Sequence, residues 1–167
     1  IILFTIMSTK TVKASKSNFI TLKTSKGSII IKTLPKIAPN HVKRIKELVS
    51  SGFYNGIIFH RVIEGFMAQT GDPLGNGTGG SGKNLKAEFS DYKYKYGTVG
   101  MARSMNPDSG DSQFFICFDG CGHLTGQYTV WGQVETGMEV VEKIEIGEPP
   151  SNPDQIIEAF VGKKKTK

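Results

Sequence analysis

The sequence predicts a mainly β domain, a barrel or a sandwich, with two helices covering its ends. Most of the chain divides into short runs of β-branched and aromatic residues, and glycine-rich turns separate these runs. Helical periodicity occurs in only two places, and no internal repeat is visible. The 167 residues fit one domain, which can bury roughly two-thirds of the surface that the unfolded chain exposes.

The first part of the chain, residues 1–17, is predicted to be an arm that is polar and lysine-rich after six apolar residues. The domain then spans residues 18–162 and begins with a β-hairpin. Two β-rich runs, 19–24 and 29–34, flank a turn that contains Gly27.

A helix is predicted over residues 39–51, because apolar side chains recur there with a helical period and polar ones occupy the other side. Pro39 suits the first turn, and Gly52 suits the C-terminal cap. A shorter helix is expected near residues 138–144. The remaining strands are predicted at residues 57–63, 66–70, 97–103, 113–118, 128–134 and 156–161.

The net charge of +6 comes largely from a lysine-rich tail, residues 163–167. Four lysines lie in this tail, so the rest of the domain is nearly balanced in charge. A solvated tail is the ordinary interpretation, and contact with nucleic acid or an acidic partner is the alternative. We therefore expect no nucleic-acid partner.

The first residues predict a cytoplasmic protein, with export to the periplasm as the alternative. Residues 1–6 are apolar and no methionine precedes them, so a start at Met7 predicts a cytoplasmic protein. Alternatively, residues 1–14 are a truncated signal peptide with a weak cleavage site at 12–14, which predicts export to the periplasm. No stretch is long enough to span a membrane, so no membrane partner is expected.

The two cysteines, Cys117 and Cys121, lie four residues apart. Because there is no second pair, they suggest neither a disulfide framework nor a four-ligand zinc site, and we expect two reduced thiols. A disulfide or redox role is the alternative. No grouping of His, Cys, Asp and Glu has metal-ligand spacing, so no metal is predicted.

A glycine-rich loop at residues 71–83 matches parts of two nucleotide-binding patterns. A phosphate loop, however, leads into a helix and places Ser or Thr directly after its lysine. Here Asn84 follows Lys83, and residues 85–90 are too short for the helix. The glycines are instead predicted to permit positive φ and close approach to a ligand backbone.

Two segments, residues 59–69 and 112–116, set a few polar groups among large apolar side chains. This is the composition of a preformed pocket beside a hydrogen-bonding site, which suits a proline and its amide. Strand alternation predicts that Phe59 and Arg61 share one face and that His60 points to the other.

The two segments resemble the cyclophilins, a family of peptidyl-prolyl cis-trans isomerases. The resemblance runs from Asn18 to Val161, and its details look more like the bacterial branch than the animal one. It implies a closed eight-stranded antiparallel β-barrel capped by two α-helices, an active groove on its outer face, no cofactor, a monomer and proline-containing polypeptides as partners. The motifs that carry it are Phe59-His60-Arg61, Gly65-Phe66-Met67-Ala68-Gln69, Gly77-Thr78-Gly79-Gly80 and Ser112-Gln113-Phe114-Phe115-Ile116-Cys117.

Carried over position by position, the resemblance implies a catalytic group that consists of Arg61, Gln69 and His60. Because the strand phase of His60 is opposite to that of Arg61, local support is the alternative to direct contact for this histidine. The implied substrate-binding residues are Phe66, Met67, Ala102, Arg103, Gln113, Phe115, His123, Leu124 and Tyr128.

The chemistry of proline isomerisation gives an independent reason for Arg61. Rotation breaks amide resonance against a barrier of roughly 18–20 kcal/mol, and the twisted proline nitrogen regains a lone pair that accepts a hydrogen bond. A permanently charged guanidinium stabilises this twisted state more than either planar state. The alternative function is a non-catalytic binding module or holdase that only grips Pro-containing segments, and it does not need the charge.

Two positions depart from the pattern of the animal members of the family. His123 stands where a tryptophan is usual, and Tyr128 stands where a histidine is usual. Because that tryptophan is associated in the family with cyclosporin, we expect weak cyclosporin binding with isomerase activity largely retained. Arg103 replaces a residue that is often asparagine, which indicates a changed preference for the residues that flank proline, in a direction the sequence leaves open.

Overall fold

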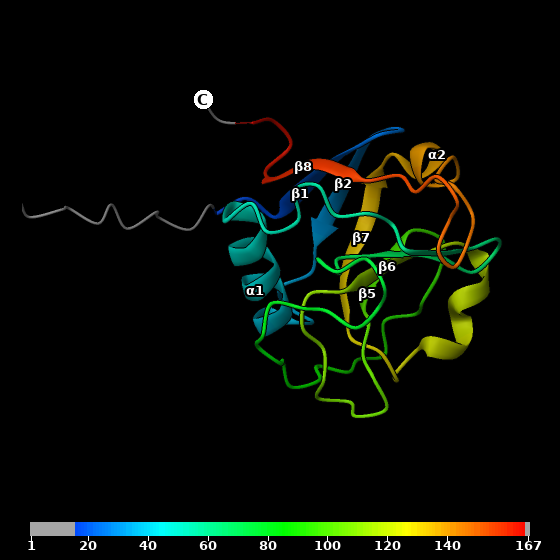
Figure 1. Ribbon diagram of the computed structural model, residues 1–167. Coiled ribbons are helices and arrows are strands. Elements are labelled where there is room, and N and C mark those ends of the chain that lie inside the picture. The colour runs from blue at the N-terminus through cyan, green and yellow to red at the C-terminus, as the bar shows by residue number, and fades with distance from the viewer. Residues whose placement is uncertain (1–15, 166–167) are drawn as a thin grey trace, which may run out of the picture.

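The computed structural model describes residues 16–165, and its centre is one curled antiparallel sheet (Figure 1). The strands are β1 (Phe19–Thr24), β2 (Gly27–Thr33), β3 (Arg61–Ile63), β4 (Met67–Thr70), β5 (Thr98–Met101), β6 (Phe114–Cys117), β7 (Val130–Thr136) and β8 (Ile156–Val161). Their order in the sheet is β3-β4-β6-β5-β7-β2-β1-β8, and each pairing is antiparallel. The predicted eight antiparallel strands are therefore confirmed.

The predicted closure of this sheet into a barrel is not confirmed. Among the described residues, the edge strands β3 and β8 do not pair with each other, and β3 is only three residues long. Isolated bridges lie near the gap between these two edge strands, with Ile58 opposite Gln155 and Val62 opposite Gly147. A three-residue edge offers too few backbone groups for a continuous ladder, so the sheet curls without closing.

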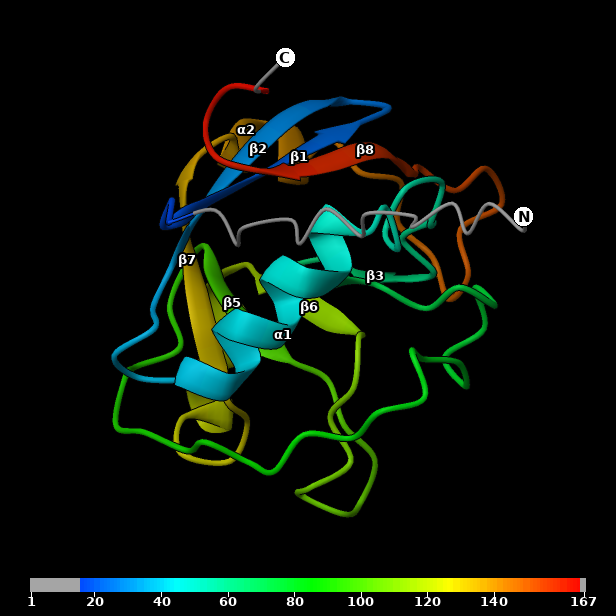
Figure 2. The same ribbon diagram turned by 90° about the vertical axis from the view of Figure 1, so that its left-hand side faces the viewer.

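Two helices and one 3₁₀ turn accompany the sheet: α1 (Pro39–Ser50), α2 (Met138–Val141) and η1 (Asp119–Leu124). The apolar side of α1 packs against β7 and β8, and Figure 2 shows this helix lying across the curl. Its predicted ends are confirmed, because Pro39 is the first helical residue and Gly52 follows the end with a φ of 79°. The glycine-containing η1 shows no helical period and was not predicted.

Alternate residues of the short strands enter two different apolar clusters. On β6, Phe114 and Ile116 belong to the main core, whereas Phe115 and Cys117 belong to a second cluster. This division follows from the period of two in a strand. The second cluster consists of Met67, Tyr94, Phe115, Cys117, Cys121, Leu124 and Val130.

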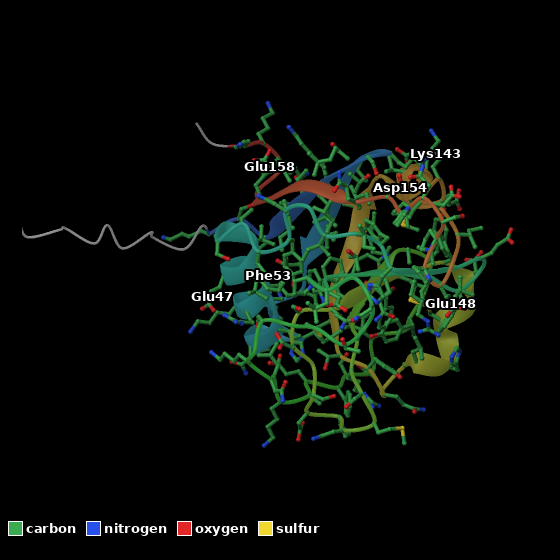
Figure 3. All side chains as sticks on the ribbon, in the orientation of Figure 1. Glu47, Phe53, Lys143, Glu148, Asp154 and Glu158 are labelled. Carbon is green, nitrogen blue, oxygen red and sulfur yellow. A yellow bond between two sulfur atoms is a disulfide. The ribbon has the colours of Figure 1, made fainter. Side chains whose placement is uncertain are left out.

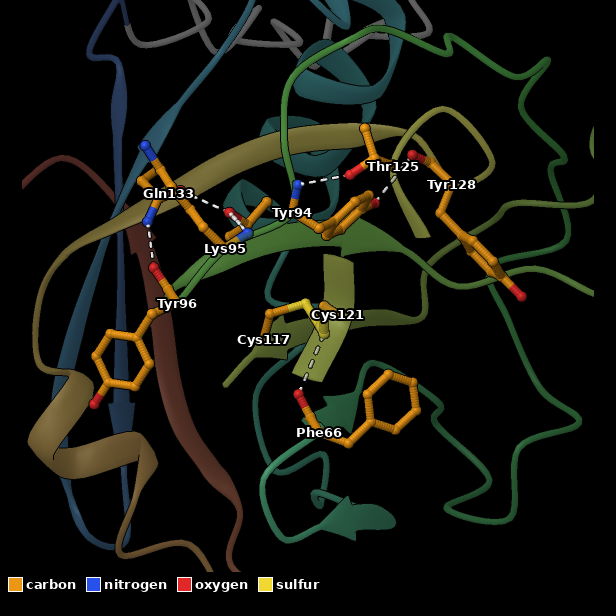
Figure 4. The surroundings of a disulfide bond; sticks show 10 residues. Phe66, Tyr94, Lys95, Tyr96, Cys117, Cys121, Thr125, Tyr128 and Gln133 are labelled. Carbon is orange, nitrogen blue, oxygen red and sulfur yellow. Dashed lines mark hydrogen bonds between the residues drawn. A yellow bond between two sulfur atoms is a disulfide. The ribbon is translucent and has the colours of Figure 1, made fainter. Parts of the chain in front are cut away.

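Cys117 and Cys121 form a disulfide, so the prediction of two reduced thiols is wrong. Cys117 ends β6, and η1 turns the chain back so that the two Cα atoms are 6.0 Å apart. Figure 4 shows the bond beside Phe66, whose carbonyl oxygen lies 3.2 Å from the Cys121 sulfur. The disulfide therefore ties η1, which carries Leu124, to the strand that carries Phe115.

The described part of the lysine-rich tail is not simply solvated. The Nζ of Lys163 lies 3.0 Å from Glu135 Oε2, and the Nζ of Lys165 lies 2.5 Å from Glu158 Oε1. Glu158 belongs to β8, at the upper edge of the molecule in Figure 3. Because these carboxylates offset two of the lysines, the tail offers less positive charge to a polyanion than its composition suggests.

The first fifteen residues of the predicted arm, with the alternative signal-peptide segment, lie outside the described residues. In the part of the chain that the structure describes, no helix has the length and apolar character needed to cross a membrane.

We expect alkylation of the native, non-reduced protein to label no thiol and alkylation after reduction and unfolding to label both cysteines. Reduction should lower the free energy of unfolding by about 2 kcal/mol, because the bond closes only a short loop. Mass spectrometry and denaturant titrations with and without reductant measure the two effects. Native labelling of both thiols, or superimposable unfolding curves, would contradict the disulfide.

Candidate active site

A row of paired residues on three neighbouring strands places the candidate site on one face of the sheet. Arg61 of β3 pairs with Gln69 of β4, and Gln69 pairs with Phe115 of β6. Met67 lies two positions before Gln69, so its side chain shares this face. Paired residues have Cβ atoms about 5 Å apart, and the register therefore brings a cation, an amide and two apolar side chains together.

Phe59 does not share this face, and the strand alternation predicted for residues 57–63 is wrong at its start. β3 begins only at Arg61, so regular alternation does not extend back to Phe59. Phe59 is buried in the main core, whereas the side chain of Arg61 is 45% exposed. An irregular approach to a very short strand accounts for the difference.

The row borders a cavity of about 140 Å³. Its wall combines large apolar side chains with the Arg61 side chain, which is the pattern expected for a small ring with a polar group attached. Every lining residue was predicted for the site from the sequence. They are Arg61, Phe66, Met67, Gln69, Ala102, Arg103, Phe115, Leu124 and Tyr128.

Phe115 is held in this wall by two other aromatic rings. It stacks on Tyr94 with ring centroids 5.7 Å apart and meets Tyr128 edge-on at 5.9 Å. The Tyr94 hydroxyl donates to the Tyr128 carbonyl at 3.0 Å (Figure 4). Gly100 pairs with Phe115, and a Cβ at Gly100 would lie 2.7 Å from the Phe115 ring. The glycine is therefore needed for the rings to lie close against β5.

Two glutamines link the row to the glycine-rich loop. Gln69 Nε2 donates to Gln113 Oε1 at 3.0 Å. Gln113 Nε2 donates to the carbonyls of Gly77 and Gly79 at 3.0 and 2.9 Å. Gln113 does not line the apolar cavity, and its role in this geometry is to connect Gln69 to the loop.

A second, larger cavity of about 480 Å³ adjoins the first, because Gln69, Ala102 and Arg103 line both. One wall is the glycine-rich loop and the other is the loop that follows β5. The remaining lining residues are Gly77, Thr78, Gly79, Gly80, Gly82, Asn84, Ser104, Ser109, Asp111 and Gln113.

The glycine-rich loop folds around the carboxylate of Asp72. Its oxygens accept hydrogen bonds from the backbone N–H groups of Leu74, Asn76 and Gly77 at 2.8, 3.2 and 2.6 Å. Burial raises the pKa of Asp72, but the hydrogen bonds from Leu74, Gly79, Gly77 and Asn76 lower it more, and the pKa lies below the ordinary 3.8. This carboxylate occupies the amides that a phosphate would need, which argues against nucleotide binding. Several loop glycines have positive φ, as predicted.

Neither predicted histidine lines the apolar cavity. His60 is buried, and burial lowers the pKa of its imidazole. The charge of Asp72 raises this pKa and that of Arg61 lowers it, so that the pKa lies below the ordinary 6.5. His123 stacks on Phe66 with ring centroids 5.6 Å apart, so it supports the cavity wall from outside. Both positions favour local support over direct contact.

Glu148 is a site residue that the sequence did not indicate. Its Oε1 accepts a hydrogen bond from Arg61 Nε at 2.8 Å, and Figure 3 labels it on the right-hand side of the molecule. The bond engages Nε and leaves the terminal Nη groups of the guanidinium, which borders the cavity, without a hydrogen-bond partner among residues 16–165. No sequence signal could have found Glu148, because it lies 87 positions from Arg61 in an irregular loop.

Comparisons with known proteins show the family of this chain. Residues 19–161 match the family described as cyclophilin type peptidyl-prolyl cis-trans isomerase/CLD. The chain belongs to the cyclophilin family. A Brucella abortus protein named "Probable peptidyl-prolyl cis-trans isomerase" is 49% identical over 165 residues, which cover 89% of this chain and 84% of that protein. A Helicobacter pylori peptidyl-prolyl cis-trans isomerase is 44% identical over 138 residues, with coverage of 80% and 84%.

Solved cyclophilin structures have the same fold. A cyclophilin from Hirschia baltica superposes with a TM-score of 0.80 at 29% identity, covering 89% of this chain and 75% of that one. A cyclophilin-type isomerase from Cryptosporidium parvum, crystallised in the presence of the dipeptide Ala-Pro, gives a TM-score of 0.81 at 28% identity, with coverage of 87% and 99%. The function of this cyclophilin is therefore that of a peptidyl-prolyl cis-trans isomerase.

We expect Glu148→Ala to lower kcat up to about five-fold with little change in KM, because an exposed ion pair contributes up to about 1 kcal/mol. The loss arises from a less ordered guanidinium rather than from a missing substrate contact. Glu148→Gln keeps an acceptor for Arg61 Nε and should retain most of the rate. Glu145→Ala, an exposed glutamate of the same loop, serves as the control. An unchanged or higher kcat in Glu148→Ala would contradict the positioning role.

Proposed function

We propose that this cyclophilin accelerates rotation about Xaa-Pro bonds with the proline ring in the 140 Å³ cavity and Arg61 beside the proline nitrogen. The single observation that carries the proposal is the row Arg61–Gln69–Phe115, which joins a cation to an apolar wall. An apolar pocket alone is enough to bind proline. The adjoining guanidinium of Arg61 also acts on the Xaa-Pro bond.

The energy that the site must supply is modest. Uncatalysed isomerisation proceeds at about 0.01 per second, and a turnover of about 10 per second requires about 4 kcal/mol of transition-state stabilisation. As the amide twists, its nitrogen becomes an acceptor for an Arg61 N–H. A charge-assisted hydrogen bond at the edge of an apolar wall can supply much of this energy. No nucleophile or titrating group takes part, and the lowered pKa of His60 keeps its imidazole neutral at pH 7.

Gln69 supports the proposal as a group that holds the peptide. Its Nε2 donates to Gln113, which leaves its side-chain oxygen directed away from that bond and able to accept from a substrate N–H. Because Gln113 is itself fixed by two loop carbonyls, the orientation of the amide is set before substrate arrives. A preformed acceptor reduces the ordering cost of binding.

The proposed partners are proline-containing polypeptides, and the Cryptosporidium parvum relative studied with Ala-Pro supports this class. We propose a monomer, as the family resemblance implies. For the compartment, the buried disulfide supports the exported alternative over the cytoplasmic one, because disulfides persist mainly in oxidising compartments. The masses of the native protein's N-terminal peptides test the choice: a start at Met7 would favour the cytoplasm.

Replacement of Arg61 separates catalysis from simple binding. We expect Arg61→Ala to reduce kcat/KM by about a hundred-fold on an Xaa-Pro peptide, while peptide affinity changes only a few-fold. Arg61→Lys should remain strongly impaired, because a lysine lacks the planar fork of N–H groups. Exchange NMR measures both the rate and the binding. An Arg61→Ala enzyme with wild-type rate would favour the non-catalytic binding module or holdase.

Weak cyclosporin binding is proposed because His123 packs on the outside of Phe66 and does not line the cavity. Calorimetric titration should give a Kd well above the nanomolar range, and His123→Trp should tighten binding at least ten-fold. Isomerase activity should persist in both proteins. A nanomolar Kd for the unaltered chain would refute the proposal.

A further inference from the structure

Arg103 occupies the boundary between the two cavities. It lies in the loop that follows β5 and lines both the 140 Å³ and the 480 Å³ cavity. A peptide whose proline fills the smaller cavity must pass this guanidinium as it extends into the larger one. Because an extended chain advances about 3.3 Å per residue, Arg103 lies within reach of side chains one or two positions from the proline.

The guanidinium of Arg103 is fixed in place by uncharged partners. Its Nε and Nη2 donate to the Gln127 carbonyl at 3.1 and 2.8 Å, and its Nη1 donates to the Ser104 carbonyl at 3.0 Å. Its central carbon lies 4.5 Å from the ring centroid of Tyr128, which in turn meets Phe115 edge-on. The cation is therefore ordered by the same aromatic stack that holds the cavity wall.

The charge of Arg103 is not neutralised within residues 16–165. Arg61 pairs with Glu148 and Arg44 pairs with Glu47, but no carboxylate lies within ion-pair distance of Arg103. Carbonyl bonds and ring stacking leave its full positive charge. They also use three of its five N–H groups, so two remain for a ligand.

Asp111, the one carboxylate that lines the larger cavity in the described part of the chain, is hydrogen-bonded to the glycine-rich loop. Asp111 Oδ1 accepts from the Ser81 N–H at 2.9 Å, and Asp111 Oδ2 accepts from the Gly82 N–H at 3.0 Å. These bonds direct the anion into the glycine-rich loop. The unpaired charge that the boundary presents to a peptide is therefore positive.

We propose that Arg103 is a specificity-determining residue that makes this cyclophilin prefer substrates with a carboxylate side chain, Asp or Glu, one or two positions from the proline. The inference rests on the proposed isomerase function and deepens it by naming a substrate class. A rigid guanidinium with free N–H groups suits a carboxylate, because little side-chain order remains to be lost on binding. The apolar cavity determines where the proline binds. Arg103 then binds the carboxylate side chain one or two positions from the proline.

The test compares matched peptides that carry Glu or Gln at each of the two positions before and the two after a single proline. Exchange NMR gives kcat/KM without a coupled protease, whose own preferences would interfere. For the wild-type chain we expect Glu to exceed Gln about three- to ten-fold at one position or more in low salt, and the ratio to fall toward one in about 0.5 M salt.

Three variants make this result specific. Arg103→Gln should bring the Glu-to-Gln ratio close to one, and Arg103→Lys, which keeps the charge but loses the planar stack, should give an intermediate ratio. Lys43→Gln removes the same charge from an exposed position on α1 that lines neither cavity, and it should keep the wild-type ratio. Because each ratio is formed within one variant, a general loss of activity in Arg103→Gln cancels.

The outcomes separate the two proposals. A Glu-to-Gln ratio near one at all four positions in an active wild-type enzyme, or an unchanged ratio in Arg103→Gln, overturns the role of Arg103 and leaves the isomerase function standing. Absence of catalysis on every peptide overturns both.

Discussion

The pairing register of β4 with its two neighbours is the constraint on which the site depends. Because side chains alternate along a strand, one register places Arg61, Gln69 and Phe115 in a row on one face, while the intervening Val62, Ala68 and Ile116 fill the main core. A slip by one residue would exchange these sets and bury the arginine. The free energy that stabilises the packed main core therefore also fixes the geometry of the candidate site.

Contacts with other segments on the outer face of the sheet form a cavity beside this row. Phe115 is held by Tyr94 and Tyr128, and the disulfide draws η1 with Leu124 over the end of β6. The two arginines at the rim have opposite surroundings. Arg61 is oriented by a carboxylate, whereas Arg103 is oriented by carbonyls and a ring, so only Arg103 keeps an uncompensated charge for the substrate.

Short motifs allowed most of the cavity wall to be predicted, because the family pattern places Arg61, Phe66 and Phe115 at recognisable positions in the sequence. Contacts between distant segments could not be predicted in this way. Glu148 meets Arg61 through an irregular loop, and Gly100 is required only because two aromatic rings lie over it. The disulfide was missed for a related reason, since nothing in the sequence indicated the turn that brings Cys121 back to Cys117.

A crystal structure of this chain with a bound Xaa-Pro peptide would show directly whether the β4 register places Arg61 beside the proline amide. We expect the proline ring against Phe115 in the 140 Å³ cavity, with the Nη groups of Arg61 facing the proline nitrogen and Nε still bonded to Glu148. A proline bound outside this cavity, or an Arg61 side chain turned away from the proline amide, would contradict it.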